Sequence, residues 1–185
     1  MEAALVLPLV IVLVMGIIDF GFAFGSKTTA SGASRSGVRL AAAAYATAGT
    51  ASTNQKAAVD KIANTVTGSL TGLTSATVIG MVVYKVDPTS TNGAPLGGFP
   101  DDNMSGGCTS ECFRYRWDGT KLVYVSGAWP DPDACGLTLD DIGVMVQVNH
   151  HYITGFVGSH VYLDGHTVMR LEPLPSDQCS SSNSG

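Results

Sequence analysis

The chain has 185 residues, of which 45% are hydrophobic and only 14% charged, against roughly 25% charged in an average soluble domain. The charge deficit is concentrated in one long apolar stretch at the N-terminal end of the sequence, which excludes a wholly soluble protein. No later stretch is apolar over a similar length, which excludes a protein with several membrane spans. The formal net charge is −5 without any basic cluster in the sequence, which argues against nucleic acid and anionic lipid headgroups as the main partners.

The first predicted element is a long helix that begins with a membrane-competent segment. Residues 3–24 are apolar or small apart from Asp19, and about 20 such residues cross a bilayer as a helix. The segment exceeds the apolar core of a signal peptide, and it starts with Glu2 where a signal peptide carries basic residues. We therefore expect it to be retained, in one helix that runs to about residue 47 and is roughly 70 Å long.

The middle of this helix admits two interpretations, because glycine and serine are frequent between residues 26 and 37 and would also suit a flexible linker. Pro8 should bend the helix, and the spacing of Gly21 and Gly25 permits close contact between helices. Helix is favoured over linker by an apolar stripe of four residues: Ala30, Ala33, Val38 and Ala41.

Two signals disagree about which side of the membrane the following domain occupies. The basic residues Lys27, Arg35 and Arg39 follow the span, which by the positive-inside rule places the domain in the cytoplasm. The cysteines all lie in that domain, and an even set there suits an oxidising exterior. Both signals are satisfied if a short basic leader once preceded Met1, so we expect the chain to be a processed, mature product.

The cysteines predict two disulfide bonds rather than a zinc site. Two of them have metal-like spacing, but the others stand alone without the second close pair of a zinc ribbon or finger. Four cysteines allow three pairings. We favour Cys112 with Cys135, which would clip a hairpin to the loop after Trp129, and Cys108 with Cys179, which would hold the tail.

A second helix is predicted after a break of small residues at 47–54, with Thr53 as its N-cap. Its polar face carries Lys56, Asp60 and Lys61. A strand rich in valine and isoleucine follows at residues 77–86, and then a long loop at 87–107. The apolar face of the second helix consists of five residues: Val59, Ile62, Ala63, Val66 and Leu70.

The clearest pattern in the second half of the chain is a hairpin, with alternating runs at 113–117 and 120–125 around Asp118-Gly119. Alternation places aromatic and basic side chains of the first run on opposite faces. The aromatic side is formed by Phe113, Tyr115 and Trp117, and the basic side by Arg114 and Arg116.

Two further strand patterns complete an antiparallel sheet. Residues 142–148 place Ile142, Val144, Val146 and Val148 on one face. Residues 161–171 contain Asp164-Gly165, and they form either a second tight hairpin or one strand with a bulge. The polar tail, residues 176–185, should be loose except where Cys179 ties it down. The predicted fold is α+β: a long apolar helix, a second helix and a C-terminal antiparallel β-sheet domain with disulfides.

No pattern typical of catalysis is present, so we expect no enzyme, no cofactor and no metal site. His150 and His151 are adjacent in a strand and point to opposite faces, which prevents chelation of one ion. The acidic turns at 131–133 and 140–141 lack the oxygen spacing of a calcium loop. A sugar-stacking role for Trp117 or Trp129 is less consistent with the pattern than a place in the core.

The two ends of the chain resemble TadE-type pilins of tight-adherence (Tad) pili. The opening Met1-Glu-Ala-Ala-Leu-Val-Leu-Pro-Leu-Val10 and Gly16-Ile-Ile-Asp-Phe-Gly21 are similar to the mature N-terminus of that family, and the runs at 142–148 and 168–173 are similar to its last strands. The cysteine, tryptophan and Asp-Ile-Gly-Val arrangement is similar to actinobacterial members. One feature departs: the glutamate of type IV pilins is usually the fifth mature residue and here is the second, so either residues are missing or processing differs.

The resemblance implies cleavage by a prepilin peptidase, export through a Tad secretion apparatus, and a place at the bacterial cell surface in an extracellular filament. We expect residues 1–47 to be a transmembrane and assembly helix, and residues 48–185 to be an extracytoplasmic head. The predicted function is a structural pilin, major or minor, in a helical filament of identical or related subunits, anchored in the membrane before assembly. The alternatives are a single-span receptor domain and, after it, a secreted enzyme. The candidate assembly residues are Glu2, Pro8, Gly21 and Gly25.

Overall fold

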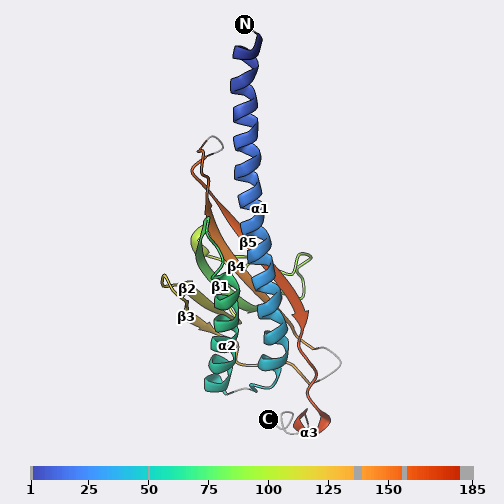
Figure 1. Ribbon diagram of the computed structural model, residues 1–185. Coiled ribbons are helices and arrows are strands. Elements are labelled where there is room, and N and C mark those ends of the chain that lie inside the picture. Colours follow the sequence, from blue (N-terminus) through green and yellow to red (C-terminus); the bar gives the residue numbers. More distant parts are fainter. Residues whose placement is uncertain (1, 50, 136–138, 156–157, 180–185) are drawn as a thin grey trace.

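A 45-residue helix and a five-stranded antiparallel sheet dominate the fold (Figure 1). The computed structural model describes residues 2–49, 51–135, 139–155 and 158–179. The predicted α+β class is confirmed. The elements are α1 (Glu2–Ala46), α2 (Ser52–Leu70), β1 (Ala76–Lys85), the 3-10 turn η1 (Asp102–Met104), β2 (Cys112–Trp117), β3 (Leu122–Ala128), β4 (Asp141–His151), β5 (His160–Arg170) and α3 (Ser176–Cys179).

Helix α1 is continuous from end to end, so residues 26–37 are helical and the linker alternative is wrong. Its N-terminal half projects from the head, whereas its C-terminal half lies against β4, β5 and α2 (Figure 1). The buried face begins at Asp19 and recurs every three or four residues, as a helix packed on one side requires. The predicted stripe lies on this face, since Ala30, Ala33, Val38 and Ala41 are all buried.

Helix α2 packs beside the C-terminal half of α1 through the five apolar residues predicted from their spacing. Gly37 brings the two helices together, because a Cβ atom at this position would stand 2.7 Å from Cγ2 of Val66. The predicted N-cap is wrong. The helix begins two residues earlier than predicted, with Ala51 at the N-cap and no side-chain capping bond, so Thr53 lies inside the first turn.

The sheet has the strand order β3-β2-β1-β4-β5 with every neighbouring pair antiparallel. Strand β4 supplies the centre of the core, because the four predicted inward residues from Ile142 to Val148 are completely buried against the helices. The predicted β2–β3 hairpin is confirmed, with a four-residue connection at 118–121 rather than a two-residue turn. There the carboxylate of Asp118 accepts hydrogen bonds from the backbone of Thr120 and Lys121.

Strand β5 differs from both alternatives left open by the sequence. It is one strand, and its pairing with β4 runs without a register shift from Asp141 opposite Arg170 to His151 opposite His160, so it has neither a tight turn nor a bulge. The glycine inside it serves the packing of α1. A Cβ atom on Gly165 would stand 2.5 Å from the backbone nitrogen of Ser31, so only glycine lets the helix backbone lie this close to the strand.

The loop between β1 and β2 is held to the sheet by Arg114. The guanidinium group donates to the carbonyl oxygen of Met104 at 3.1 Å, and also to those of Gly106, Gly107 and Cys108. Four backbone carbonyl groups of the loop thereby accept hydrogen bonds from a charged donor. Several residues of this loop have positive φ angles. The basic face predicted for β2 is therefore, at this position, an internal clamp.

The prediction that the four cysteines form two disulfides is confirmed, but the favoured pairing is wrong. The structure joins Cys108 to Cys112 and Cys135 to Cys179. The first bond closes the end of the β1–β2 loop, where Cys108 adopts φ 43° and brings its Cα within 6.2 Å of that of Cys112. The second ties α3 to the loop before β4. This anchors the tail as far as Cys179; residues 180–185 of the predicted tail lie outside the described residues.

The two disulfides should differ in their effect on stability because they close loops of different length. We expect loss of Cys135–Cys179, which spans 44 residues, to lower the free energy of unfolding by about 4 kcal/mol, and loss of Cys108–Cys112, which spans four, by about 2 kcal/mol. Urea unfolding of the two paired Cys→Ser variants measures the difference. Peptide mapping under non-reducing conditions checks the connectivity, and a Cys112–Cys135 peptide would contradict it.

Candidate assembly surface

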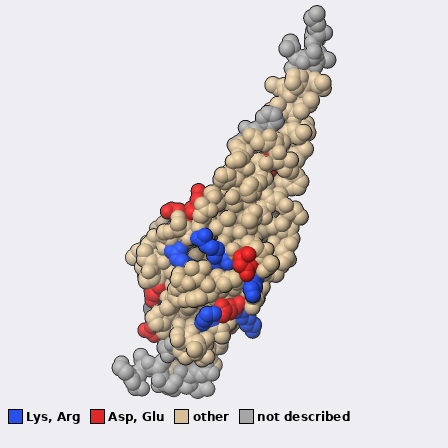
Figure 2. Space-filling model, turned by 90° about the vertical axis from the view of Figure 1, so that its left-hand side faces the viewer, with Lys and Arg blue, Asp and Glu red and all other residues tan. Residues whose placement is uncertain are grey.

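The projecting half of α1 presents an apolar surface to its surroundings. Thirteen large hydrophobic side chains between residues 6 and 22 are 40–70% exposed, and Phe24 is 71% exposed. In Figure 2 the charged side chains gather on the head, whereas the projecting part of the helix is almost free of them on the face shown. Within the described residues α1 is the one helix long and apolar enough to cross a membrane. This surface needs a lipid or protein partner.

The predicted assembly residues lie along this same part of the helix. Gly21 and Gly25 are exposed, and a Cβ atom added to either would meet nothing within 4 Å. Their close-approach surface is therefore unused within the chain and open to another helix. Pro8 lies inside the continuous helix. The backbone of Glu2 starts α1, but its side chain lies outside the described residues.

Asp19 interrupts the apolar surface and was not predicted as a site. Its side chain is completely buried, although its sequence neighbours Ile18 and Phe20 are exposed. One carboxylate oxygen accepts the backbone N–H of Ile153 at 3.0 Å; the other accepts the backbone N–H of Thr154 at 3.3 Å and its hydroxyl group. The segment after β4 thus supplies three donors to the single acidic group of the span, and it fixes the sheet to α1 at that height.

A second polar contact lies two helical turns further along α1. Ser26 is buried and its hydroxyl lies 3.2 Å from Nδ1 of His150 and 3.4 Å from the hydroxyl of Ser75. The predicted separation of the two neighbouring histidines is confirmed, since His150 is completely buried and His151 is exposed. The sequence signal that could have revealed this site is the combination of one aspartate and one serine on the buried face of an otherwise apolar stripe.

His150 should make the head less stable in acid. Burial lowers the pKa of His150; the charge of Asp19 opposes this, and the neighbouring His151 adds to it. The folded state therefore disfavours the imidazolium form, so its stability is highest above the ordinary pKa of about 6.5 and falls as the pH decreases through that value. We expect His150→Gln to flatten this dependence. Urea midpoints at about pH 7.5 and 5.5 measure it, and an unchanged difference in the variant would contradict the assignment.

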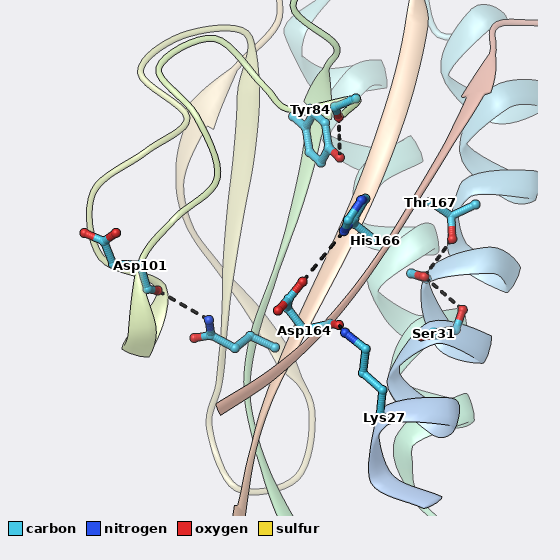
Figure 3. A network of polar contacts seen from close by, with 10 residues as sticks. Lys27, Ser31, Tyr84, Asp101, Asp164, His166 and Thr167 are labelled. Carbon is cyan, nitrogen blue, oxygen red and sulfur yellow. Dashed lines mark hydrogen bonds and ion pairs between the residues drawn. The ribbon is translucent and has the colours of Figure 1, made fainter. Parts of the chain in front are cut away.

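Polar contacts also line the seam between α1 and β5 (Figure 3). The ammonium group of Lys27 donates to the backbone oxygen of Asp164, and the side chain of Asp164 lies 3.7 Å from Nδ1 of His166. Further along the helix, the hydroxyl of Ser34 lies 2.9 Å from that of Thr167. The buried hydroxyl of Ser34 is therefore matched by a polar group of β5.

Other candidate residues have structural roles. Trp129 is completely buried, with its ring stacked on Tyr45 at 4.8 Å between centroids, so it is a core residue and not a sugar platform. The carboxylate of Asp140 lies 3.0 Å from the ammonium group of Lys85. It also accepts the backbone N–H of Asp133 at 2.8 Å, so a hydrogen bond links the two acidic turns. Among the described residues, no group of three or more His, Cys, Asp or Glu could hold a metal ion.

The apolar helix with its acidic interruption is also the segment that a family comparison identifies. Residues 1–39 match the family model described as TadE-like protein. The chain carries a TadE-like N-terminal segment. Comparison with curated proteins found no match, and comparison with solved structures found none either. The TadE-like segment ends within the part of α1 that packs on the head, so it includes the exposed apolar surface, Asp19 and Ser26. It is consistent with a membrane-anchored, pilus-related protein.

Proposed function

We propose that this protein is a structural subunit of a Tad-type pilus filament, major or minor, which polymerises through the projecting half of α1. The observation that carries the proposal is a TadE-like helix whose N-terminal half exposes a continuous apolar surface outside the head. We take residues 1–47 as the membrane and assembly helix and residues 48–185 as the extracytoplasmic head, with the C-terminal half of the helix packed into that head.

The physical basis is the change of environment on leaving the membrane. In lipid the apolar side chains of α1 gain little from contact with one another beyond packing. Outside lipid each Å² buried contributes about 25 cal/mol, so burial of 1,000 Å² on the helices of neighbouring subunits contributes on the order of 25 kcal/mol before the costs of ordering. Assembly is then favourable after extraction, whereas extraction needs energy from a motor. The Tad secretion apparatus and a prepilin peptidase are the proposed partners, and no enzymatic activity is assigned.

Shearing of the cell surface distinguishes the filament subunit from an anchored receptor. We expect sheared material from producing cells to contain filaments by electron microscopy and this chain by mass spectrometry, with its abundance separating a major from a minor subunit. A receptor would stay entirely in the membrane fraction. A variant with Phe20→Lys, which places a charge on the exposed apolar surface, should abolish incorporation, whereas Val125→Lys on the exposed face of β3 should not.

Glu2 is proposed to set the axial register between subunits. An unpaired carboxylate among apolar helices costs several kcal/mol, so within a filament it should be protonated or meet a cation of a neighbouring subunit. We expect Glu2→Gln, which keeps size and hydrogen bonding, to accumulate in the membrane without incorporation. Glu172→Gln, at an exposed position of the head, is the matched control. Normal incorporation of Glu2→Gln in sheared filaments would exclude the pairing.

A further inference from the structure

The segment that follows β4 reaches a part of α1 that is otherwise exposed and apolar. Figure 1 shows the β4–β5 hairpin extending along α1 beyond the rest of the sheet. Its contact with Asp19 fixes how far it reaches, since Ile153 and Thr154 donate to that carboxylate. Phe24 lies five residues nearer the head than Asp19, which is about 8 Å along the helix axis. Its side chain is 71% exposed. The hairpin therefore passes beyond the last exposed aromatic residue of the span.

The side chains of this segment suit an apolar environment. Ile153 is 66% exposed, and it lines the same open depression as Phe22 of α1. No Asp, Glu, Lys or Arg occurs between residues 142 and 163 of the sequence. Phe22 and Ile153 are therefore neighbouring apolar residues of helix and hairpin, in a depression that Thr74, Ser75, Thr77, His151 and Tyr152 also line without any formally charged acidic or basic group.

Polar residues lie on the head side of Phe22 and Ile153. His151 and His160 face each other across the hairpin with their ring centroids 6.2 Å apart, and both are exposed. Ile153 follows His151 by two residues, about 7 Å along an extended chain. On the helix, Lys27 plays the same part, as the first cation after the span. The two histidines and the lysine lie on the head side of the apolar surface, as residues at a headgroup layer do.

The contact with Asp19 lowers the cost of placing polar groups of α1 and of the hairpin in lipid. Irregular backbone is tolerated at membrane depth only where its polar groups are paired within the protein, and a carboxylate there is costly unless it is paired. The N–H groups of Ile153 and Thr154 pair with the carboxylate of Asp19, and the hydroxyl of Thr154 adds a third donor. The contact therefore pairs the Asp19 carboxylate and two backbone N–H groups of the hairpin at once, which lowers the cost of placing Asp19 and Ile153 beside lipid.

We propose that the β4–β5 hairpin is a second membrane contact of the anchored subunit, with Ile153 inserted among the lipid acyl chains beside α1. The inference rests on the membrane-anchored stage of the proposed function. It assigns to the hairpin the task of fixing the tilt and depth of the head at the bilayer, because two contacts separated across the surface restrict rotation where a single helix does not.

Photocrosslinking of the full chain in nanodiscs of phosphatidylcholine and phosphatidylglycerol tests the proposal. Benzoylphenylalanine replaces one exposed residue at a time: Ile153 in the hairpin, Phe20 in the span, or Val125 on β3 as the head control. We expect lipid adducts at position 153 to approach those at position 20 and to exceed those at position 125 on the order of ten-fold. All three sites are exposed in the folded chain, so the substitutions leave the core intact.

Three other adduct patterns would contradict the inference, and each has a different meaning. If position 20 gives lipid adducts but position 153 gives no more than position 125, the helix is anchored and the hairpin lies outside the bilayer. Adducts at position 153 to a second copy of the chain, seen as a crosslinked dimer, would assign the hairpin to subunit contact instead. Absence of lipid adducts at position 20 would remove the membrane-anchored stage, and with it the proposed function.

Discussion

Gly165→Ala is expected to lower the free energy of unfolding of the head by about 3 kcal/mol, near the upper end of the usual cost of overpacking. The added Cβ atom would stand 2.5 Å from the backbone nitrogen of Ser31 and 2.6 Å from the carbonyl carbon of Ala30. Neither is the end of a flexible side chain, so α1 itself must move away from β5. The substitution therefore tests the packing that joins the assembly helix to the sheet.

Gly68→Ala provides the matched control for this prediction. Gly68 lies in α2, and a Cβ atom there meets nothing within 4 Å, so alanine should stabilise the helix by up to about 1 kcal/mol. Urea unfolding of the full chain in detergent, followed by the fluorescence of the buried Trp129, measures both variants. A Gly165→Ala variant as stable as the parent would mean that helix and strand can separate at little cost, and the close packing would not be essential.

Asp19→Ala is expected to release the segment after β4 from α1. Hydrogen bonds to a charged group contribute roughly 1.5–3 kcal/mol each, and the carboxylate accepts two backbone N–H groups and one hydroxyl. Allowing for the relief of a buried charge, we expect the opening free energy of this segment to fall by about 3 kcal/mol. Hydrogen exchange at the amides of Ile153 and Thr154 should then accelerate on the order of a hundred-fold.

Asp19→Asn separates the charge of this group from its shape. The amide oxygen can still accept the N–H of Ile153, whereas the amide nitrogen faces the donors of Thr154, so exchange should accelerate at Thr154 more than at Ile153. Amides of β2, which is two strands away from β4 in the sheet, serve as the internal reference. Unchanged exchange at both amides in Asp19→Ala would show that other contacts hold the segment, and the aspartate would have no anchoring role.

Much of this fold follows from periodicity in the sequence, because the apolar side chains of each element face a single core. The stripe of α1, the apolar face of α2 and the alternation in β2 and β4 each require only that one side of a helix or strand is buried. The exposed apolar half of α1 is also predictable from the sequence. Its run of apolar residues is longer than a small head could cover. These features identified the fold class and the candidate assembly surface.

Three features depended on tertiary structure, because each is decided by how separate segments of the chain fold back and pack on one another. The disulfide pairing follows from the path of the β1–β2 loop, which turns Cys108 back onto Cys112 and leaves Cys135 to α3. Gly165 resembles a turn residue until α1 is placed against it. Asp19 is a lone acidic residue in the span until the chain after β4 brings donors to it, 134 residues later. Local pattern records which side of an element is buried, whereas the partner on that side is decided only when the elements pack.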